Sequence, residues 1–133
     1  MAAPVVFSHT IHVPAEDIDQ MGHVSNITVV RYVQDVAAAH WLSFVPDDVK
    51  AKYLWVVRRH EIDYLKQSFL GDELTVRTWV GEMSGARWDR HTEIVRQTDS
   101  AVVVRARTEW VLLDAISGRP RRVDPAWANW TMK

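Results

Sequence analysis

Residues 16–41 read EDIDQMGHVSNITVVRYVQDVAAAHW, and this stretch decides the fold that the sequence predicts. In its second half, apolar residues recur at spacings of three and four, which is the periodicity of an α-helix. Ser25 or Asn26 is placed to cap the first turn, because a side-chain oxygen there can accept a hydrogen bond from a free backbone N–H. We therefore predict a helix from about Asn26 to Ser43. Since apolar side chains cover most of its circumference, other elements must surround this helix.

The first half of the same stretch is a polar loop that ends just ahead of the predicted helix. It holds two acids, Asp17 and Asp19, and then a tight turn at Gly22 and His23. Asp17 is expected to be solvated or to form a turn, which are usual roles of an aspartate in a loop. A single helix with a carboxylate close to its N-terminus is the feature on which a functional hypothesis can be built.

Composition indicates a soluble globular protein with a single domain, residues 1–133. Apolar residues make up 47% and charged residues 25% of the chain. The formal net charge of −1 gives no electrostatic reason to expect a nucleic acid or an anionic membrane as a partner. The absence of cysteine excludes disulfides, thiolate catalysis and cysteine-based metal centres. No apolar run approaches the roughly 20 residues of a membrane span and no signal peptide is recognisable, so we expect a cytoplasmic protein.

Most of the remaining chain is rich in β-branched residues or alternates between polar and apolar residues, as strands do. The predicted strands are residues 4–13, 54–69, 73–83, 86–97 and 101–114. Because short turns separate the last four, we expect them to form an antiparallel meander, which makes the chain an α+β domain. Asp124 and Pro125 predict a short terminal helix. A single sheet layer on one helix leaves strand edges and apolar helix surface uncovered, which favours a homodimer or a homotetramer.

The loop DIDQMGHVSN, the helix after it and the later segment IDYLKQSFLGDELTV resemble the hotdog-fold acyl-CoA thioesterases. The most similar branch is the one that contains 4-hydroxybenzoyl-CoA thioesterase, and the resemblance covers roughly residues 5–123. It implies a curved antiparallel sheet wrapped around one long central helix. The chain departs from the motifs at Ser25, where Asn is usual, at Gln67, where Pro is common, and at Val29 or Val30, where a Tyr is common.

The resemblance implies hydrolysis of an acyl-CoA or acyl-carrier-protein thioester, with Asp19 as nucleophile or general base. The oxyanion would be held by the backbone N–H near Asn26, where the start of a helix carries positive partial charge. Gly22 would contact substrate, and His23 is a candidate acid or base. Each has a structural alternative: Asp19 or Asn26 as a cap, and His23 as a residue that shapes the loop.

A coenzyme A site needs local positive charge for its phosphates. The resemblance points to the bend at Ser84 and Gly85, followed by Arg87 and Arg90, as the region that contacts this part of the substrate. The basic cluster at 119–122 is a second candidate, and both clusters have the alternative of an ordinary solvated surface. No cofactor is expected, because the coenzyme A thioester is the substrate, and no spacing of His, Asp or Glu indicates a metal site.

Two other functions fit the same resemblance. A hydratase or dehydratase would use Asp19 and His23 as an acid/base pair, although the loop lacks the Asn-Pro step that this motif usually contains. The third possibility is a protein that binds acyl thioesters without turning them over. The acyl group itself is not predicted by the sequence.

Overall fold

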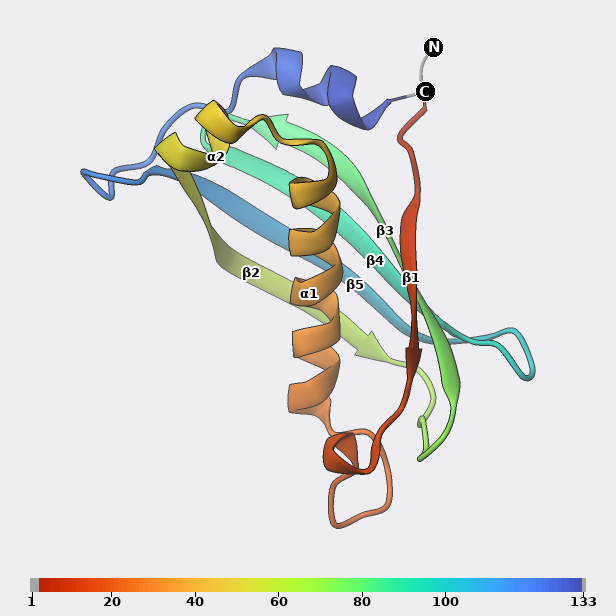
Figure 1. The fold of residues 1–133 in the computed structure, drawn as a ribbon. Coiled ribbons are helices and arrows are strands. Elements are labelled where there is room, and N and C mark those ends of the chain that lie inside the picture. Colours follow the sequence, from red (N-terminus) through yellow and green to blue (C-terminus); the bar gives the residue numbers. More distant parts are fainter. Residues whose placement is uncertain (1–2, 133) are drawn as a thin grey trace.

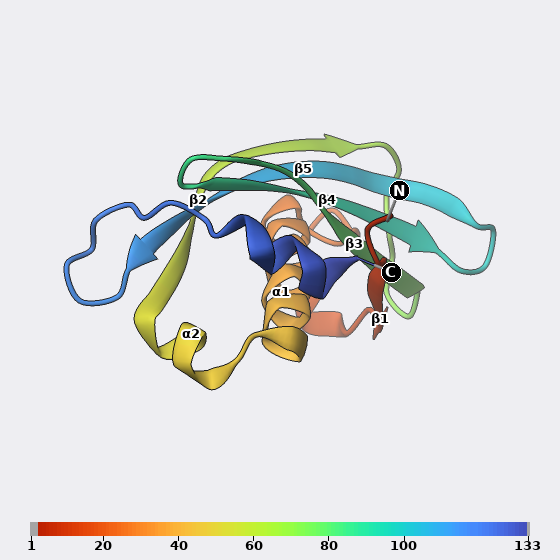
Figure 2. The ribbon, with the colours of Figure 1, turned by 90° about the horizontal axis from the view of Figure 1, so that it is seen from above.

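A computed structural model describes residues 3–132 as one antiparallel sheet curved around one long helix (Figure 1). The strands are β1 (Phe7–His12), β2 (Tyr53–Tyr64), β3 (Glu73–Ser84), β4 (Arg87–Arg96) and β5 (Ala101–Asp114). The helices are η1 (Ala15–Asp17), α1 (Asn26–Phe44), α2 (Asp47–Lys52) and η2 (Pro125–Thr131). Figure 2 shows the sheet arching over α1, with η2 lying across one end of the helix. In residues 3–132 no helix combines the length and the apolar character that crossing a membrane requires.

The predicted central helix is confirmed as α1, which runs one residue further than expected. Ser25 is its cap: the Ser25 Oγ accepts a hydrogen bond from the Thr28 backbone N–H at 3.1 Å. Tyr32, Val33 and Val36 face the sheet and are almost completely buried. The β-branched residues of this helix are tolerated because their side chains gain more from burial than they lose in helix propensity.

The strand order is β1-β3-β4-β5-β2, so the predicted meander of the last four strands is only partly right. Strands β3, β4 and β5 do follow one another as antiparallel neighbours. Strand β2 instead pairs with β5 at the far edge, and β1 takes the place beside β3. One edge of the sheet is therefore the short β1 and the other is the long β2.

The connection between β2 and β3 explains this order. Strand β2 ends at Tyr64, earlier than predicted, and residues 65–72 cross beneath the sheet. Along this crossing, the Leu65 N–H donates to the Val103 carbonyl at 2.8 Å, and the Ser68 carbonyl accepts from the Val24 N–H at 2.8 Å. Because its backbone groups are satisfied on the way, the segment can span the sheet without forming a turn between neighbouring strands.

The core has two parts along α1. Toward the helix N-terminus, aliphatic residues such as Val36, Leu74 and Val103 pack together. Toward the C-terminus the packing is aromatic: the Trp41 ring lies 5.5 Å from that of Trp55 and 5.6 Å from that of Trp127. The aliphatic end thus lies near the polar loop, and the aromatic end lies under η2.

Ion pairs cover much of the sheet face turned away from α1, where the Trp79 ring also stacks on His91. Arg77 and Arg105 both contact Glu93. A second group of ion pairs centres on Arg107. Its Nη2 lies 2.6 Å from Asp89 Oδ2, and its guanidinium also contacts Glu61 and Glu109. We call these residues the outer charge network.

Candidate active site

The loop ahead of α1 is held in one conformation by backbone hydrogen bonds. The Asp19 N–H donates to the His23 carbonyl at 2.8 Å, and the Gly22 N–H donates to the Asp19 carbonyl at 3.0 Å. Gly22 has φ +84°, a conformation that residues with a Cβ rarely adopt, which explains the glycine at this position. The structure therefore brings Asp19, Gly22 and His23 together in one tight turn.

The Asp19 side chain is exposed and takes part in the same turn. Its Oδ1 accepts hydrogen bonds from the Met21 N–H at 2.8 Å and the His23 N–H at 3.4 Å. No hydrogen bond to Oδ2 is recorded among the described residues. These contacts fix the direction of the carboxylate and leave one oxygen open to a substrate or a water molecule.

The start of α1 lies beside this turn, because Ile18 and Val24 form an isolated antiparallel bridge between them. The N–H groups of Thr28 and Val29 are capped by Ser25. Across residues 3–132, by contrast, no acceptor is recorded for the N–H of Asn26 or of Ile27. Free N–H groups at a helix start carry positive partial charge and suit an oxyanion.

Asp17 is not solvated, as the sequence led us to expect, but is buried with 4% of its surface exposed. It accepts hydrogen bonds from the Tyr32 hydroxyl and from Arg31 Nη2, the latter at 2.8 Å. Burial acts to raise the pKa of Asp17, but these two donors outweigh it and hold the pKa below its usual range. Asp17 therefore ties the loop to α1, a structural role in which it remains charged.

His23 packs its ring edge-on against Phe69 of the crossing segment, with the ring centroids 5.5 Å apart. The far end of β2 reaches the same place, because the Tyr64 hydroxyl lies 3.5 Å from the Asn26 carbonyl oxygen. Four of the predicted site residues, Asp19, Gly22, His23 and Asn26, are thus gathered at one end of the molecule.

The other predicted site residues lie at the opposite end of the sheet. Ser84 and Gly85 form the turn after β3, a strand of 12 residues that spans roughly 35 Å from the Asp19 end. Arg87 is half-exposed there, and its Nη1 lies 3.8 Å from Glu109 Oε2 of the outer charge network. Within one protomer, this bend is too distant to share a small substrate group with Asp19.

Arg90 does not share the surface of Arg87, because it points to the opposite face of β4. Only 7% of its surface is exposed, so it is not part of a basic surface at the Ser84–Gly85 bend, where the resemblance placed it. Its Nη1 donates to His40 Nδ1 at 2.8 Å and to Thr78 Oγ1 at 3.2 Å. The alternation along β4, which places Trp88, Arg90 and Ile94 on one face, is the sequence signal for this burial.

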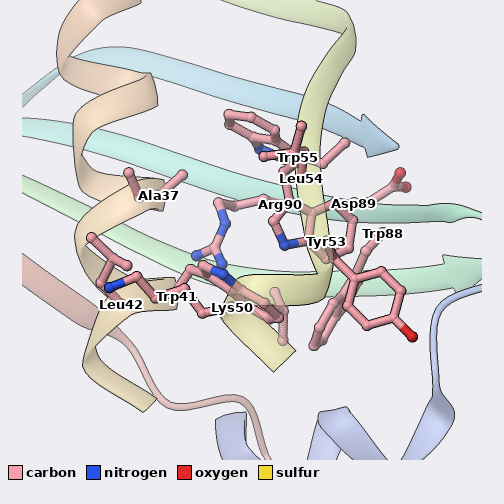
Figure 3. A pocket seen from close by; sticks show the side chains of 13 residues that line it. Ala37, Trp41, Leu42, Lys50, Tyr53, Leu54, Trp55, Trp88, Asp89 and Arg90 are labelled. Atoms are coloured by element: carbon pink, nitrogen blue, oxygen red, sulfur yellow. The ribbon is translucent and has the colours of Figure 1, made fainter. Parts of the chain in front are cut away.

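Arg90 lines a cavity of about 400 Å³ between α1 and strands β2, β4 and β5 (Figure 3). The other lining residues are mostly aromatic or aliphatic: Ala37, Ala38, Trp41, Leu42, Lys50, Tyr53, Leu54, Trp55, Val80, Trp88, Asp89 and Trp110. Four of the seven tryptophans line this cavity. Figure 3 shows the Arg90 side chain reaching from β4 into the space beside Trp41.

The partner of Arg90 is a neutral histidine. Burial, and then the charge of Arg90, lower the pKa of His40 to about 4, so its Nδ1 is free to accept the hydrogen bond at neutral pH. Burial also lowers the pKa of Arg90 to about 10, which leaves the guanidinium charged at neutral pH. The pair therefore places one uncompensated positive charge at the wall of the cavity.

A family model described as the thioesterase-like superfamily matches residues 13–131. The chain belongs to this superfamily. The match takes in the Asp19 turn, α1, the whole cavity and η2. No curated protein sequence gives a significant match.

Solved structures with the same fold carry related names. A 1,4-dihydroxy-2-naphthoyl-CoA thioesterase from Synechocystis is 17% identical, with a TM-score of 0.81 and 95% of each chain covered. A hypothetical Staphylococcus aureus protein solved in complex with CoA is 16% identical, with a TM-score of 0.82, 96% of this chain and 82% of that chain covered. A 12:0-ACP thioesterase from Umbellularia californica is 19% identical, with a TM-score of 0.80, 93% of this chain and 48% of that chain covered.

At these identities the solved structures show the fold, and the family model shows the family. The predicted hotdog fold and membership among the thioesterase-like enzymes are therefore confirmed. The narrower branch, that of 4-hydroxybenzoyl-CoA thioesterase, stays a prediction, as do the roles of the individual site residues.

Proposed function

We propose that the protein hydrolyses the thioester of an acyl-CoA, or of an acyl carrier protein, to a free acid and a thiol. The observation that carries this proposal is the Asp19 carboxylate in a fixed turn beside the two free N–H groups that open α1. Membership in the thioesterase-like superfamily supports it. A relative solved with CoA and another named an ACP thioesterase make both carriers reasonable.

The geometry supports separate roles for the N–H groups at the start of α1 and for the Asp19 carboxylate. The thioester carbonyl oxygen would accept hydrogen bonds from the Asn26 and Ile27 N–H groups, which stabilise the negative charge that forms on it. Asp19 would either attack the carbonyl carbon, giving an acyl anhydride that water then cleaves, or take a proton from an attacking water. In both routes the thiolate leaves and takes up a proton, for which His23 in the same turn is available.

The first experiment measures free thiol released from a panel of acyl-CoAs that includes aliphatic and aromatic members. Release of thiol above the uncatalysed rate supports the proposal. Loss of the enoyl absorbance of crotonyl-CoA without thiol release would indicate a hydratase instead. Saturable binding of acyl-CoA with neither reaction would indicate a binding protein.

A second copy of the chain is part of this proposal. Strand β2 is a long edge with no neighbour on its outer side within residues 3–132. Beside it, a stripe along α1 remains exposed, including Ile27 at 84% and Leu42 at 55%. Gln34, on the same stripe, reaches His60 of β2 at 3.3 Å, which places stripe and edge together. A dimer formed by antiparallel pairing of two β2 strands would cover both the outer edge of β2 and the exposed stripe of α1.

Such a dimer would also join the separated parts of the site. A two-fold axis through β2 reverses the direction of the second copy, so its opposite end comes to lie beside the Asp19 end of the first. The bend at Ser84 and Gly85 of one copy would then lie at the same end as Asp19 of the other. This arrangement would explain why the two groups of predicted site residues are far apart within one chain.

We predict that Ile27→Glu weakens this dimer, because it places a charge in an apolar contact. Wild type should sediment as a dimer at micromolar concentration, and the variant should sediment largely as a monomer of about 15.3 kDa. Val6→Glu is the matched control, since Val6 is 53% exposed just before β1, at the sheet edge opposite to β2, and should leave the dimer intact. A wild-type monomer, or equal effects of the two changes, would contradict this interface.

Arg87→Ala should raise KM for acyl-CoA by roughly three- to tenfold and change kcat little. Arg87 would contact the remote phosphates, so its contribution is nearly the same before and during the reaction. Steady-state kinetics of Arg87→Ala and Arg119→Ala provide the comparison. A raised KM in the Arg119 variant alone would move the coenzyme A groove to the basic cluster at 119–122.

A further inference from the structure

We propose that the cavity beside α1 holds the far end of the substrate acyl group, and that this end carries a carboxylate that pairs with Arg90. The inference rests on the proposed thioesterase function and on the β2 dimer, and it adds the substrate class. It assigns to Arg90 a role in substrate specificity, distinct from the chemistry at Asp19.

The first argument is the missing counter-ion. Among residues 3–132, no carboxylate oxygen lies within 4.0 Å of the Arg90 guanidinium, although the arginine is buried. The nearby Asp89 is already paired with Arg107 on the other face of the sheet, at 2.6 Å. A buried charge without a counter-ion lowers the stability of the folded protein. Binding of an anion beside the Arg90 guanidinium would offset that cost.

The second argument is the direction of the free donors. Only Nη1 of Arg90 has recorded partners, His40 and Thr78, while Nε and Nη2 have none among the described residues. The interior thus offers hydrogen-bond donors to a ligand, and a carboxylate has the acceptor oxygens that match them.

The third argument is the shape and chemistry of the walls. Apart from Arg90, the interior is formed largely by the rings of Trp41, Trp55, Trp88 and Trp110. Such walls favour a planar or aliphatic body over a polar one. A volume of about 400 Å³ lies within the range of small-molecule sites. An apolar acyl body that ends in one carboxylate therefore satisfies both the walls and the cation.

The dimer supplies the connection to the reacting carbonyl. Within one chain, the rise of α1 from Asn26 to Trp41 separates the cavity from the free N–H groups by roughly 22 Å. Trp41 contacts Trp55 near the start of β2, whereas Tyr64 at its end approaches Asn26. Antiparallel pairing of two β2 strands would therefore place the cavity of one copy beside the helix start of the other.

The test compares CoA thioesters that differ only in charge: 4-carboxybenzoyl against 4-carbamoylbenzoyl, and adipyl against its terminal amide. For at least one pair, wild type should favour the carboxylate by about tenfold or more in kcat/KM, as a buried charge-assisted hydrogen bond allows. Arg90→Met, which roughly keeps the volume, should remove that preference. Arg90→Lys should recover part of it, because the charge is retained. Preference for the amide in both pairs, or an unchanged preference in folded Arg90→Met, would overturn the proposal.

Lys50→Met is the matched control, since Lys50 is an exposed cation at the rim of the same cavity and should keep the preference. A second measurement does not depend on turnover. Terephthalate should quench the tryptophan fluorescence of wild type saturably, and Arg90→Met should weaken its binding by at least about tenfold. Quenching without any thioesterase activity would uphold the anion site and reject the proposed function. Thiol release with neither a preference for the carboxylate nor quenching by terephthalate would support the proposed function and reject the anion site.

Discussion

Replacing Asp19 with asparagine should lower kcat by about 100-fold or more while the protein still folds and forms its dimer, the scale of losing a general base or nucleophile. Asparagine has nearly the same size, and its side-chain oxygen can still accept the hydrogen bonds from the Met21 and His23 N–H groups. It is, however, a poor base and a poor nucleophile. Thiol-release kinetics, together with a melting curve for each variant, make the measurement.

Asp114→Asn is the matched control for this change. Asp114 also organises a turn through its Oδ1, which accepts from the Ile116 N–H at 3.0 Å and the Ser117 N–H at 2.9 Å, but it stands at the end of β5. Its replacement should change kcat by less than about threefold. Wild-type turnover in folded Asp19→Asn would show that Asp19 does no more than Asp114 does, and would end its catalytic assignment.

The largest loss of stability is expected from Asp17→Ala. This change leaves the buried Tyr32 hydroxyl without its acceptor and removes the nearer of the two carboxylates that Arg31 contacts. Because Arg31 is 55% exposed, water replaces part of its contact, and we expect the free energy of unfolding to fall by about 2–3 kcal/mol. Urea unfolding of both proteins gives the difference. Glu16→Ala, one position earlier and exposed, should cost less than about 0.5 kcal/mol.

The contacts of Asp17 also predict that the free energy of unfolding depends on pH. Its two hydrogen-bond donors hold the folded-state pKa of Asp17 below the usual value of an aspartate. The charge of Asp17 therefore stabilises the fold above that usual value, and the contribution is lost as pH falls through the folded-state pKa. The difference between wild type and Asp17→Ala should therefore be constant near neutrality and shrink below about pH 4. A difference that stays constant to pH 2 would show that the Asp17 charge adds nothing to stability.

The sequence predicted what depends on local patterns. The helix followed from the spacing of apolar residues and from the cap at Ser25, both of which act within a few residues. The turn at Gly22 followed from residue type, because a positive φ favours glycine. Asp19 and Asn26 were located by the motif that these local features form.

What the sequence did not predict depends on contacts between distant segments. The place of β2 beside β5 is set by the crossing of residues 65–72, and no local pattern distinguishes it from a meander. Asp17 is buried because Tyr32, 15 residues away, comes to lie over it. Arg90 was assigned to the basic bend that the resemblance implied, and its partner His40 lies 50 residues away in the chain.

The outer charge network limits how copies of this protein can pack. Stacking a second sheet on this face would strip water from the ion pairs around Arg107 and Glu93, and new contacts seldom repay that cost. Two molecules that collide face to face are therefore expected to separate again, whereas two that meet along β2 can pair their backbones. The charges thus act against layered aggregation through this face of the sheet.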